Sequence, residues 1–205
     1  MEEQLPRLLA AAGMTPVLAA VSMRRVREEE IRALLAAGLT DLLDAEIEGH
    51  PGAADAVLAS VRARPFKLLL ENSLSRFVSF DALTLIRAAA EVTVDGGGAE
   101  ELAELFDSQE RTVSGWCARE ALPPPRRLLA WLRLILALAL LADPERGVSK
   151  AATAAGYTDH SLRRALRTFL GAGKPTRAWY AADALAAFNA ELAGLREQTR
   201  QRRRK

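Results

Sequence analysis

The sequence has little of several features that mark common classes of protein. It contains one cysteine, Cys117, so no disulfide can form within the chain and too few thiolates are present for a zinc site. Aromatic residues make up 5% of its 205 residues, so a core would be filled mainly by aliphatic side chains on helices. The most apolar stretch, residues 128–142, includes Arg133 and is shorter than the roughly 20 apolar residues that cross a bilayer.

The amino terminus, Met-Glu-Glu-Gln, lacks the basic segment that begins a secretion signal. Together with the lone cysteine, this predicts a cytoplasmic protein without a membrane partner.

Residues that would indicate catalysis are also scarce. The two histidines, His50 and His160, are far apart in the chain, and no nucleophile elbow, metal triad or carboxylate pair is present. The glycine triplet at 96–98 is not followed by the Lys-Ser/Thr of a phosphate-binding loop. We therefore expect no enzyme activity, no metal and no cofactor.

Charge is divided unevenly along the chain. Residues 1–98 hold 10 Lys/Arg and 14 Asp/Glu, a net charge of −4, whereas residues 99–205 hold 18 and 12, a net charge of +6. A basic half beside an acidic half is typical of a protein that contacts nucleic acid through one part of its chain.

In the first part of the chain, short apolar runs alternate with helical patterns. Such alternation predicts a small α/β domain over residues 1–95. The expected strands are 17–23, 39–47 and 66–70, and the expected helices are 5–12, 24–37, 53–63 and 81–92, the last capped by Asp81. Over residues 15–64 this pattern resembles half of a response-regulator receiver, but the acidic pair and the phosphoacceptor strand are absent. Phosphorylation is therefore not expected.

The segment Asp95-Gly96-Gly97-Gly98 is the predicted domain boundary, because three glycines neither continue a helix nor fill a core. After it no strand pattern is found, which predicts an all-α domain over 96–182, followed at 183–205 by the end of a helix and a basic tail. The fold class is thus mainly α with a small α/β amino-terminal domain. The expected helices are 99–105, 109–119, 125–142, 148–155, 160–170 and 176–199.

Two pairs of these helices have the spacing of a helix-turn-helix. In the first pair, a turn at 106–108 precedes a helix that would present polar side chains to the major groove of DNA. In the second pair, Gly156 makes the turn and Asp159 or Ser161 caps the following helix, which exposes three arginines. The candidate DNA-reading residues are Gln109, Glu110, Arg111, Thr112 and Ser114 in the first unit and His160, Ser161, Arg163, Arg164 and Arg167 in the second.

The segment between the two pairs, residues 125–141, predicts a helix of about 25 Å. A helix of this length would hold the two reading helices about one DNA turn, near 34 Å, apart. Candidate phosphate contacts are Arg126, Arg127, Lys150 and Lys174.

The stretch Arg133-Leu134-x-x-Ala137-x-x-Leu140-Leu141 resembles the linker helix of AraC-type transcriptional regulators. Leu102-Ala103 and Arg111-Thr112-Val113-Ser114 are similar to the first unit of that family. The second unit is matched by Val148, Ala151/Ala152, Gly156-Tyr157, Ser161, Phe169, Gly171 and Pro175. The resemblance covers residues 99–180 and implies a double helix-turn-helix that binds DNA. The chain departs from the pattern in the spacing around Gly171, at Ser108, and at Gly115 within a reading helix.

These features predict a sequence-specific, DNA-binding transcriptional regulator of the bacterial nucleoid that reads two successive major-groove segments. Its amino-terminal domain would be a surface for RNA polymerase or for a second copy of the chain. The alternative is a non-catalytic protein-interaction module whose helix-turn-helix domain has lost its DNA contacts. Steep salt dependence of duplex binding would separate the two.

Overall fold

The computed structural model describes residues 18–21, 29–30, 41–44, 53–74, 78–143, 146–171 and 181–203. The chain divides into two compact units, Met1–Leu68 and Leu69–Lys205. The expected helix at 5–12, most of the one at 24–37, and Lys174 lie outside the described residues.

In the first unit, two short strands pair in parallel. Strand β1 (Leu18–Val21) lies beside β2 (Asp41–Asp44), with Leu18 opposite Asp41 and Val21 opposite Asp44. Both strands fall within segments predicted as strands. The expected three-stranded α/β domain is nevertheless not supported, because the third predicted strand is helical.

That third segment, 66–70, lies inside helix α3 (Ala53–Leu74), so the prediction of a strand there was wrong. Phe66, Leu70 and Leu74 are buried at intervals of four residues, which is the spacing of one helix face. A five-residue apolar run is too short to distinguish a strand from a buried helix segment. Pro65 lies within this helix.

The described part of the second unit is helical throughout, which confirms the all-α prediction for this part of the chain. After α3 come α4 (Phe80–Val94), α5 (Ala99–Glu104), α6 (Glu110–Arg119), α7 (Pro125–Leu140), α8 (Val148–Ala154), α9 (Asp159–Leu170) and α10 (Ala181–Arg203). Helix α4 is capped by Ser79, whose hydroxyl accepts from the backbone N–H of Ala82, and not by Asp81 as predicted.

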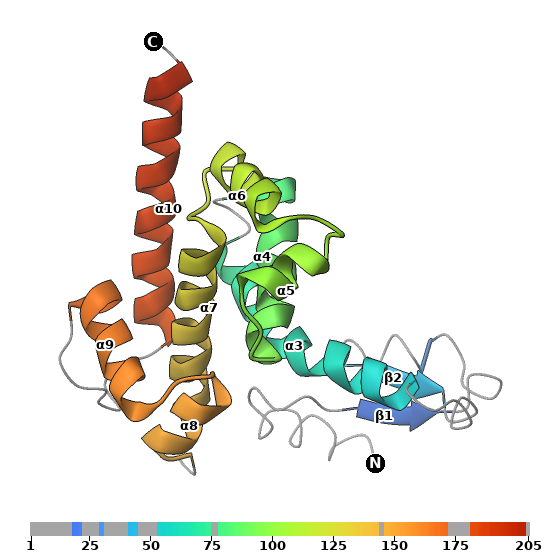
Figure 1. Cartoon of the computed structure of the whole chain (residues 1–205). Coiled ribbons are helices and arrows are strands. Elements are labelled where there is room, and N and C mark those ends of the chain that lie inside the picture. Colours follow the sequence, from blue (N-terminus) through green and yellow to red (C-terminus); the bar gives the residue numbers. More distant parts are fainter. Residues whose placement is uncertain are drawn as a thin grey trace. The chain divides into compact units, whose positions relative to one another are not determined.

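Helix α7 forms the centre of this unit. Eleven of its sixteen residues are buried, Trp131 and Ile135 among them, and every other helix from α4 to α10 contacts it. In Figure 1, α10 runs beside α7 on one side, and α4, α5 and α6 lie on the other. Because α4 packs on α7, the compact unit begins near Leu69, well before the boundary predicted at Asp95–Gly98.

The glycine triplet instead makes a tight turn between α4 and α5. Gly96 adopts a left-handed conformation with φ of 78°, and the N–H of Gly97 donates to the carbonyl of Val92 at 2.8 Å. A Cβ on Gly97 would lie 3.0 Å from a methyl group of Val92, so a side chain there would force Val92 to shift by a few tenths of an ångström. Among the described residues, no helix is both long and apolar enough to cross a membrane.

Candidate nucleic-acid interface

Helices α5–α6 and α8–α9 are two copies of one backbone arrangement, displaced by 49 residues. From here on they are called the first and the second helix-turn-helix unit. Both pairs start from a glycine, Gly98 in the first and Gly147 in the second, and their second helices start from Gln109 and Thr158. The same positions are also buried in both pairs. These are Leu102 and Ala151, Ala103 and Ala152, Val113 and Leu162, and Cys117 and Leu166.

The turns within the two pairs are held by equivalent hydrogen bonds. The N–H of Ser108 donates to the carbonyl of Ala103 at 3.0 Å, and that of Tyr157 donates to Ala152 at 2.8 Å. The residue before each donor is left-handed, Asp107 with φ of 48° and Gly156 with φ of 74°. The register between the units therefore follows from the backbone, and residue n of the first corresponds to residue n + 49 of the second.

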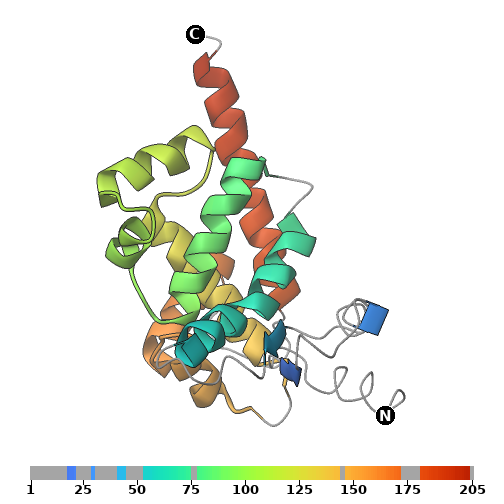
Figure 2. The same ribbon diagram turned by 90° about the vertical axis from the view of Figure 1, so that its right-hand side faces the viewer.

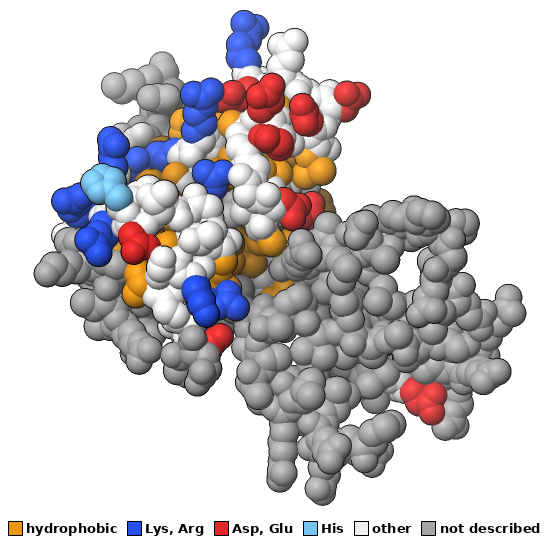
Figure 3. All heavy atoms as spheres, turned by 60° about the horizontal axis from the view of Figure 1, so that its bottom comes forward, with side chains coloured by type: hydrophobic (Ala, Val, Ile, Leu, Met, Phe, Trp, Pro, Cys, Tyr) orange, Lys and Arg blue, Asp and Glu red, His pale blue; other side chains and the backbone are white. Residues whose placement is uncertain are grey.

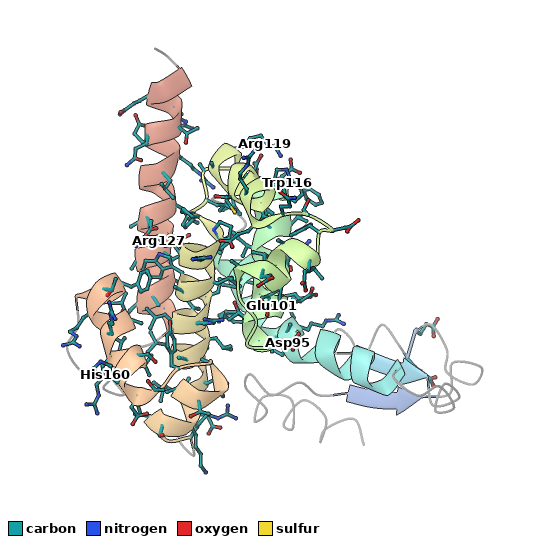
Figure 4. All side chains as sticks on the ribbon, viewed as in Figure 1. Asp95, Glu101, Trp116, Arg119, Arg127 and His160 are labelled. Carbon is teal, nitrogen blue, oxygen red and sulfur yellow. The ribbon has the colours of Figure 1, made fainter. Side chains whose placement is uncertain are left out.

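Helix α9 presents a basic face to solvent. Four exposed side chains lie on the face opposite the buried Leu162 and Leu166, and they are His160, Arg163, Arg164 and Arg167. Within the described part of the chain, none of the three arginines forms an ion pair. Figure 3 shows Lys and Arg side chains gathered around the pale blue histidine, and in Figure 4 His160 points away from the helical body.

The start of α9 is fixed by a reciprocal cap. The Thr158 hydroxyl accepts from the N–H of Ser161 at 3.1 Å, and the Ser161 hydroxyl accepts from the N–H of Thr158 at 2.8 Å. The N-cap is thus Thr158, and the prediction of Asp159 or Ser161 as the cap was wrong. Because its hydroxyl is used inside the cap, Ser161 positions the helix, and its contact with a base stays a prediction.

Helix α6 presents a different face. Gln109, Arg111 and Thr112 are exposed and Ser114 is half-buried, but Gly115 and Ala118 occupy the centre of the exposed side. Glu110, expected to read a base, is instead half-buried and bound to Arg126, whose guanidinium donates to the two carboxylate oxygens at 3.0 and 3.2 Å. Of the predicted readers in this unit, only Arg111 is a cation.

Three of the four predicted phosphate contacts lie among the described residues, and their surroundings differ. Lys150 is exposed on α8, and no ion pair of its side chain is found among the described residues. Arg126 is 81% exposed but is paired with Glu110. Arg127 is held by Glu191 of α10, with nitrogen–oxygen distances of 2.6 and 2.7 Å. Arg127 is therefore already paired within the chain, and its contact with a phosphate stays a prediction.

Arg127 belongs to a cluster that joins α7, α9 and α10. Glu191 also accepts from the indole N–H of Trp131 at 2.9 Å. The Trp131 ring lies 4.4 Å from Phe169 of α9 and 5.5 Å from Phe188 of α10, measured between ring centroids, and the Arg127 guanidinium lies 5.2 Å from Phe169. The hydrogen bonds from Arg127, followed by that from Trp131, lower the pKa of Glu191, although partial burial opposes this.

This cluster fixes the carboxyl-terminal half of α9 against the rest of the unit. Glu191 lies 64 residues from Arg127, so no local pattern in the sequence indicates the pair. In Figure 4 Arg127 lies between α7 and α10, consistent with these contacts.

Arg133 makes a second connection, near the turns of both units. Its guanidinium donates to the carbonyl of Gly97 at 2.5 Å, just before α5. Its Nε is buried without a hydrogen-bond partner and lies 3.9 Å from where a Cβ on Gly156 would be. The neighbouring Tyr157 donates its hydroxyl to the carbonyl of Ala130 at 3.1 Å, and burial raises its pKa to about 12. Helix α7 therefore holds both units through side chains as well as through its apolar surface.

The two helix-turn-helix units pack near the two ends of α7. In Figure 2, α5–α6 and α8–α9 both lie to the left of α10, one above the other, in yellow-green and orange. Helix α6 lies beside the first turns of α7, and α8 lies beside its last turns (Figure 1). A rod of 16 residues, about 24 Å long, separates them.

In comparisons with known proteins, no family model, no curated protein and no solved structure matches the chain.

Proposed function

We propose that this protein is a sequence-specific, DNA-binding transcriptional regulator of the AraC type that acts in the bacterial cytoplasm without a catalytic role. One observation carries the proposal. The second helix of a helix-turn-helix, α9, exposes Arg163, Arg164 and Arg167 on one face without intramolecular ion pairs in the described chain. Exposed guanidinium groups on such a helix are suited to guanine edges in the major groove and to the flanking phosphates.

The repeat supports contact with two successive segments of the duplex. Two backbones of the same form pack against α7, near its two ends. In this proposal α9 occupies one major-groove segment, α6 the next, and Lys150 contacts a phosphate beside α9. RNA polymerase or a second copy of the chain would bind elsewhere, through the amino-terminal part.

The test is selection of bound duplexes from random DNA with the full chain, followed by titration of the winning sequence at several salt concentrations. Because each neutralised phosphate releases counterions, the logarithm of the association constant should fall linearly with the logarithm of salt, by about 0.9 per phosphate. R163A/R167A should weaken specific binding by about 2–6 kcal/mol, at roughly 1–3 kcal/mol per arginine. R64A/K67A, which removes two positive charges from α3, controls for the change in net charge.

A second experiment tests whether α6 faces the duplex. Ser114 and Ala118 correspond to Arg163 and Arg167 in the repeat. If α6 enters a groove, S114R/A118R should tighten binding by about tenfold and steepen the salt dependence. Unchanged binding would remove α6 from the interface and leave a single reading helix.

One observation favours a second candidate function, a protein-interaction module. Residues 99–120 carry two arginines and six carboxylates, a net charge of −4, which disfavours approach to phosphates. Failure to bind any duplex even at low salt would reject the regulator and favour this module.

A further inference from the structure

The register between the two units allows their reading faces to be compared position by position. Arg111 corresponds to His160, Ser114 to Arg163, Gly115 to Arg164, and Ala118 to Arg167. Three arginines on α9 are therefore matched on α6 by residues with small or no side chains. The backbone is the same, but the chemistry of the exposed face is not.

The net charge around the two faces also differs, being positive around α9 and negative around α6. Residues 148–169 carry four Lys/Arg and one carboxylate, a net charge of +3 with histidine counted as neutral, against −4 for the equivalent residues 99–120. Lys150 of α8 corresponds to Glu101 of α5. Glu101 is used to cap the helix, since its carboxylate accepts from the N–H of Gly98 at 2.8 Å. Glu100 and Glu104 are exposed on α5, on the helix that would cross the phosphate backbone.

Cations near the first unit do not reverse this difference. Arg126 is bound to Glu110, and Arg119 lies 3.7 Å from Glu120. Glu120 in turn accepts from the Ser79 hydroxyl at 2.7 Å. Arg111 is the one cation of the α6 face without such a partner in the described chain.

We infer that recognition is one-sided: α9 reads a guanine-rich segment of duplex DNA and supplies nearly all of the affinity and specificity, whereas α6 adds little. This inference rests on the proposed function and names the class of DNA that it acts on. Arginine pairs with the O6 and N7 atoms of guanine through two hydrogen bonds, and three arginines on one face of a helix can address neighbouring base pairs. The α6 face can offer one arginine, the Thr112 methyl and hydroxyl groups, and the Ser114 hydroxyl.

The experiment is the selection described above, read for the distribution of sequence information. We expect one block of conserved guanines flanked by a tolerant segment, and a duplex that keeps the block alone should bind within about threefold of the full site. R163A and R167A should each weaken binding to this duplex by roughly ten- to hundredfold. R111A, which removes the cation of the α6 face that has no ion pair in the described chain, should weaken binding to the full site by less than threefold.

Two informative blocks of similar strength, or equal losses from R111A and R163A, would overturn the inference while leaving DNA binding intact. A single block without guanine would overturn it as well. Failure of the proposed function is a different result, because the selection would then retain no duplex. Circular dichroism of each variant would show that lost binding does not come from lost helix.

Discussion

The two helix-turn-helix units share one backbone but are stabilised by different side chains. In both, a left-handed residue makes the turn and small or apolar residues fill the inner positions. In the second unit the turn residue is Gly156, which adopts positive φ freely, whereas the first uses Asp107, one of the few other residue types that tolerate it. The second unit has a reciprocal cap at Thr158, whereas the Gln109 side chain makes no capping bond.

Their inner faces also differ. Leu166 of α9 corresponds to Cys117 of α6, and Phe169, stacked on Trp131, corresponds to Glu120 at the end of α6. The backbone hydrogen bonds and a few buried positions are thus enough to define this supersecondary structure. The remaining positions are free to become basic in one unit and small or acidic in the other, and this is where the exposed chemistry of the units differs.

The largest difference in the free energy of unfolding should come from substitutions on the inner faces of the two units. Leu166 is fully buried, so L166A should lower the free energy of unfolding by about 2–5 kcal/mol through lost burial and the cavity left behind. C117A, at the matched position, removes one sulfur and should cost about 1 kcal/mol. Urea unfolding followed by circular dichroism measures both. Equal losses would mean that the two inner faces are packed equally well despite their different side chains.

The next effect concerns the cluster that only the second unit has. E191Q keeps the shape of the side chain but removes the charge that holds Arg127 and Trp131, and it should cost about 1–2 kcal/mol at neutral pH, since Arg127 is 48% exposed and partly screened. E100Q, on exposed α5, should change the free energy of unfolding by less than about 0.5 kcal/mol.

The ion pair between Glu191 and Arg127 also makes the free energy of unfolding depend on pH. The pKa of Glu191 is lowered in the folded state, so its contribution is present above the ordinary glutamate pKa, about 4.3, and is lost as the pH falls through the folded value. The difference between wild type and E191Q should therefore close below about pH 4. A difference that persists under acid would assign the effect to packing around Trp131 instead of to charge.

A smaller effect is expected at the caps. T158A removes the hydroxyl that binds the N–H of Ser161 and should cost about 1 kcal/mol. Q109A, at the matched position, removes a side chain that makes no such bond and should be close to neutral. The comparison is made by thermal unfolding at one pH, and a loss in Q109A as large as that in T158A would show that the cap hydroxyl is not the cause.

Helices α4 to α9 could be predicted from sequence to within a few residues, because each carries an apolar face of helical period or an end signal. The turn at Gly156 and the Pro-initiated start of α7 are such signals. The strand predicted at 66–70 failed because a short apolar run has no period of its own. The glycine triplet was interpreted as a domain boundary because a boundary and a tight turn within a domain have the same composition.

The candidate site could be predicted only in part. The exposed arginines of α9 follow from the helical spacing of Leu162 and Leu166, which are buried. The partners of Arg126 and Arg127 did not follow, since Glu110 and Glu191 lie 16 and 64 residues away and meet them only through the packing of α6 and α10 on α7. A sequence pattern shows which side chains can be charged and exposed, but not which of them are already neutralised.

The smallest change in the free energy of unfolding is expected at two glycines that serve opposite purposes. Gly115 lies inside α6, and a Cβ there would meet no atom within 4 Å, so G115A should raise the free energy of unfolding by up to about 1 kcal/mol through helix propensity. Gly156 has φ of 74°, so G156A should lower it by about 1 kcal/mol, although space is available. Duplex binding separates two roles for Gly115. If α6 adds little to recognition, G115A binds DNA as tightly as wild type, whereas a marked loss would show that α6 approaches the duplex so closely that even a methyl group interferes.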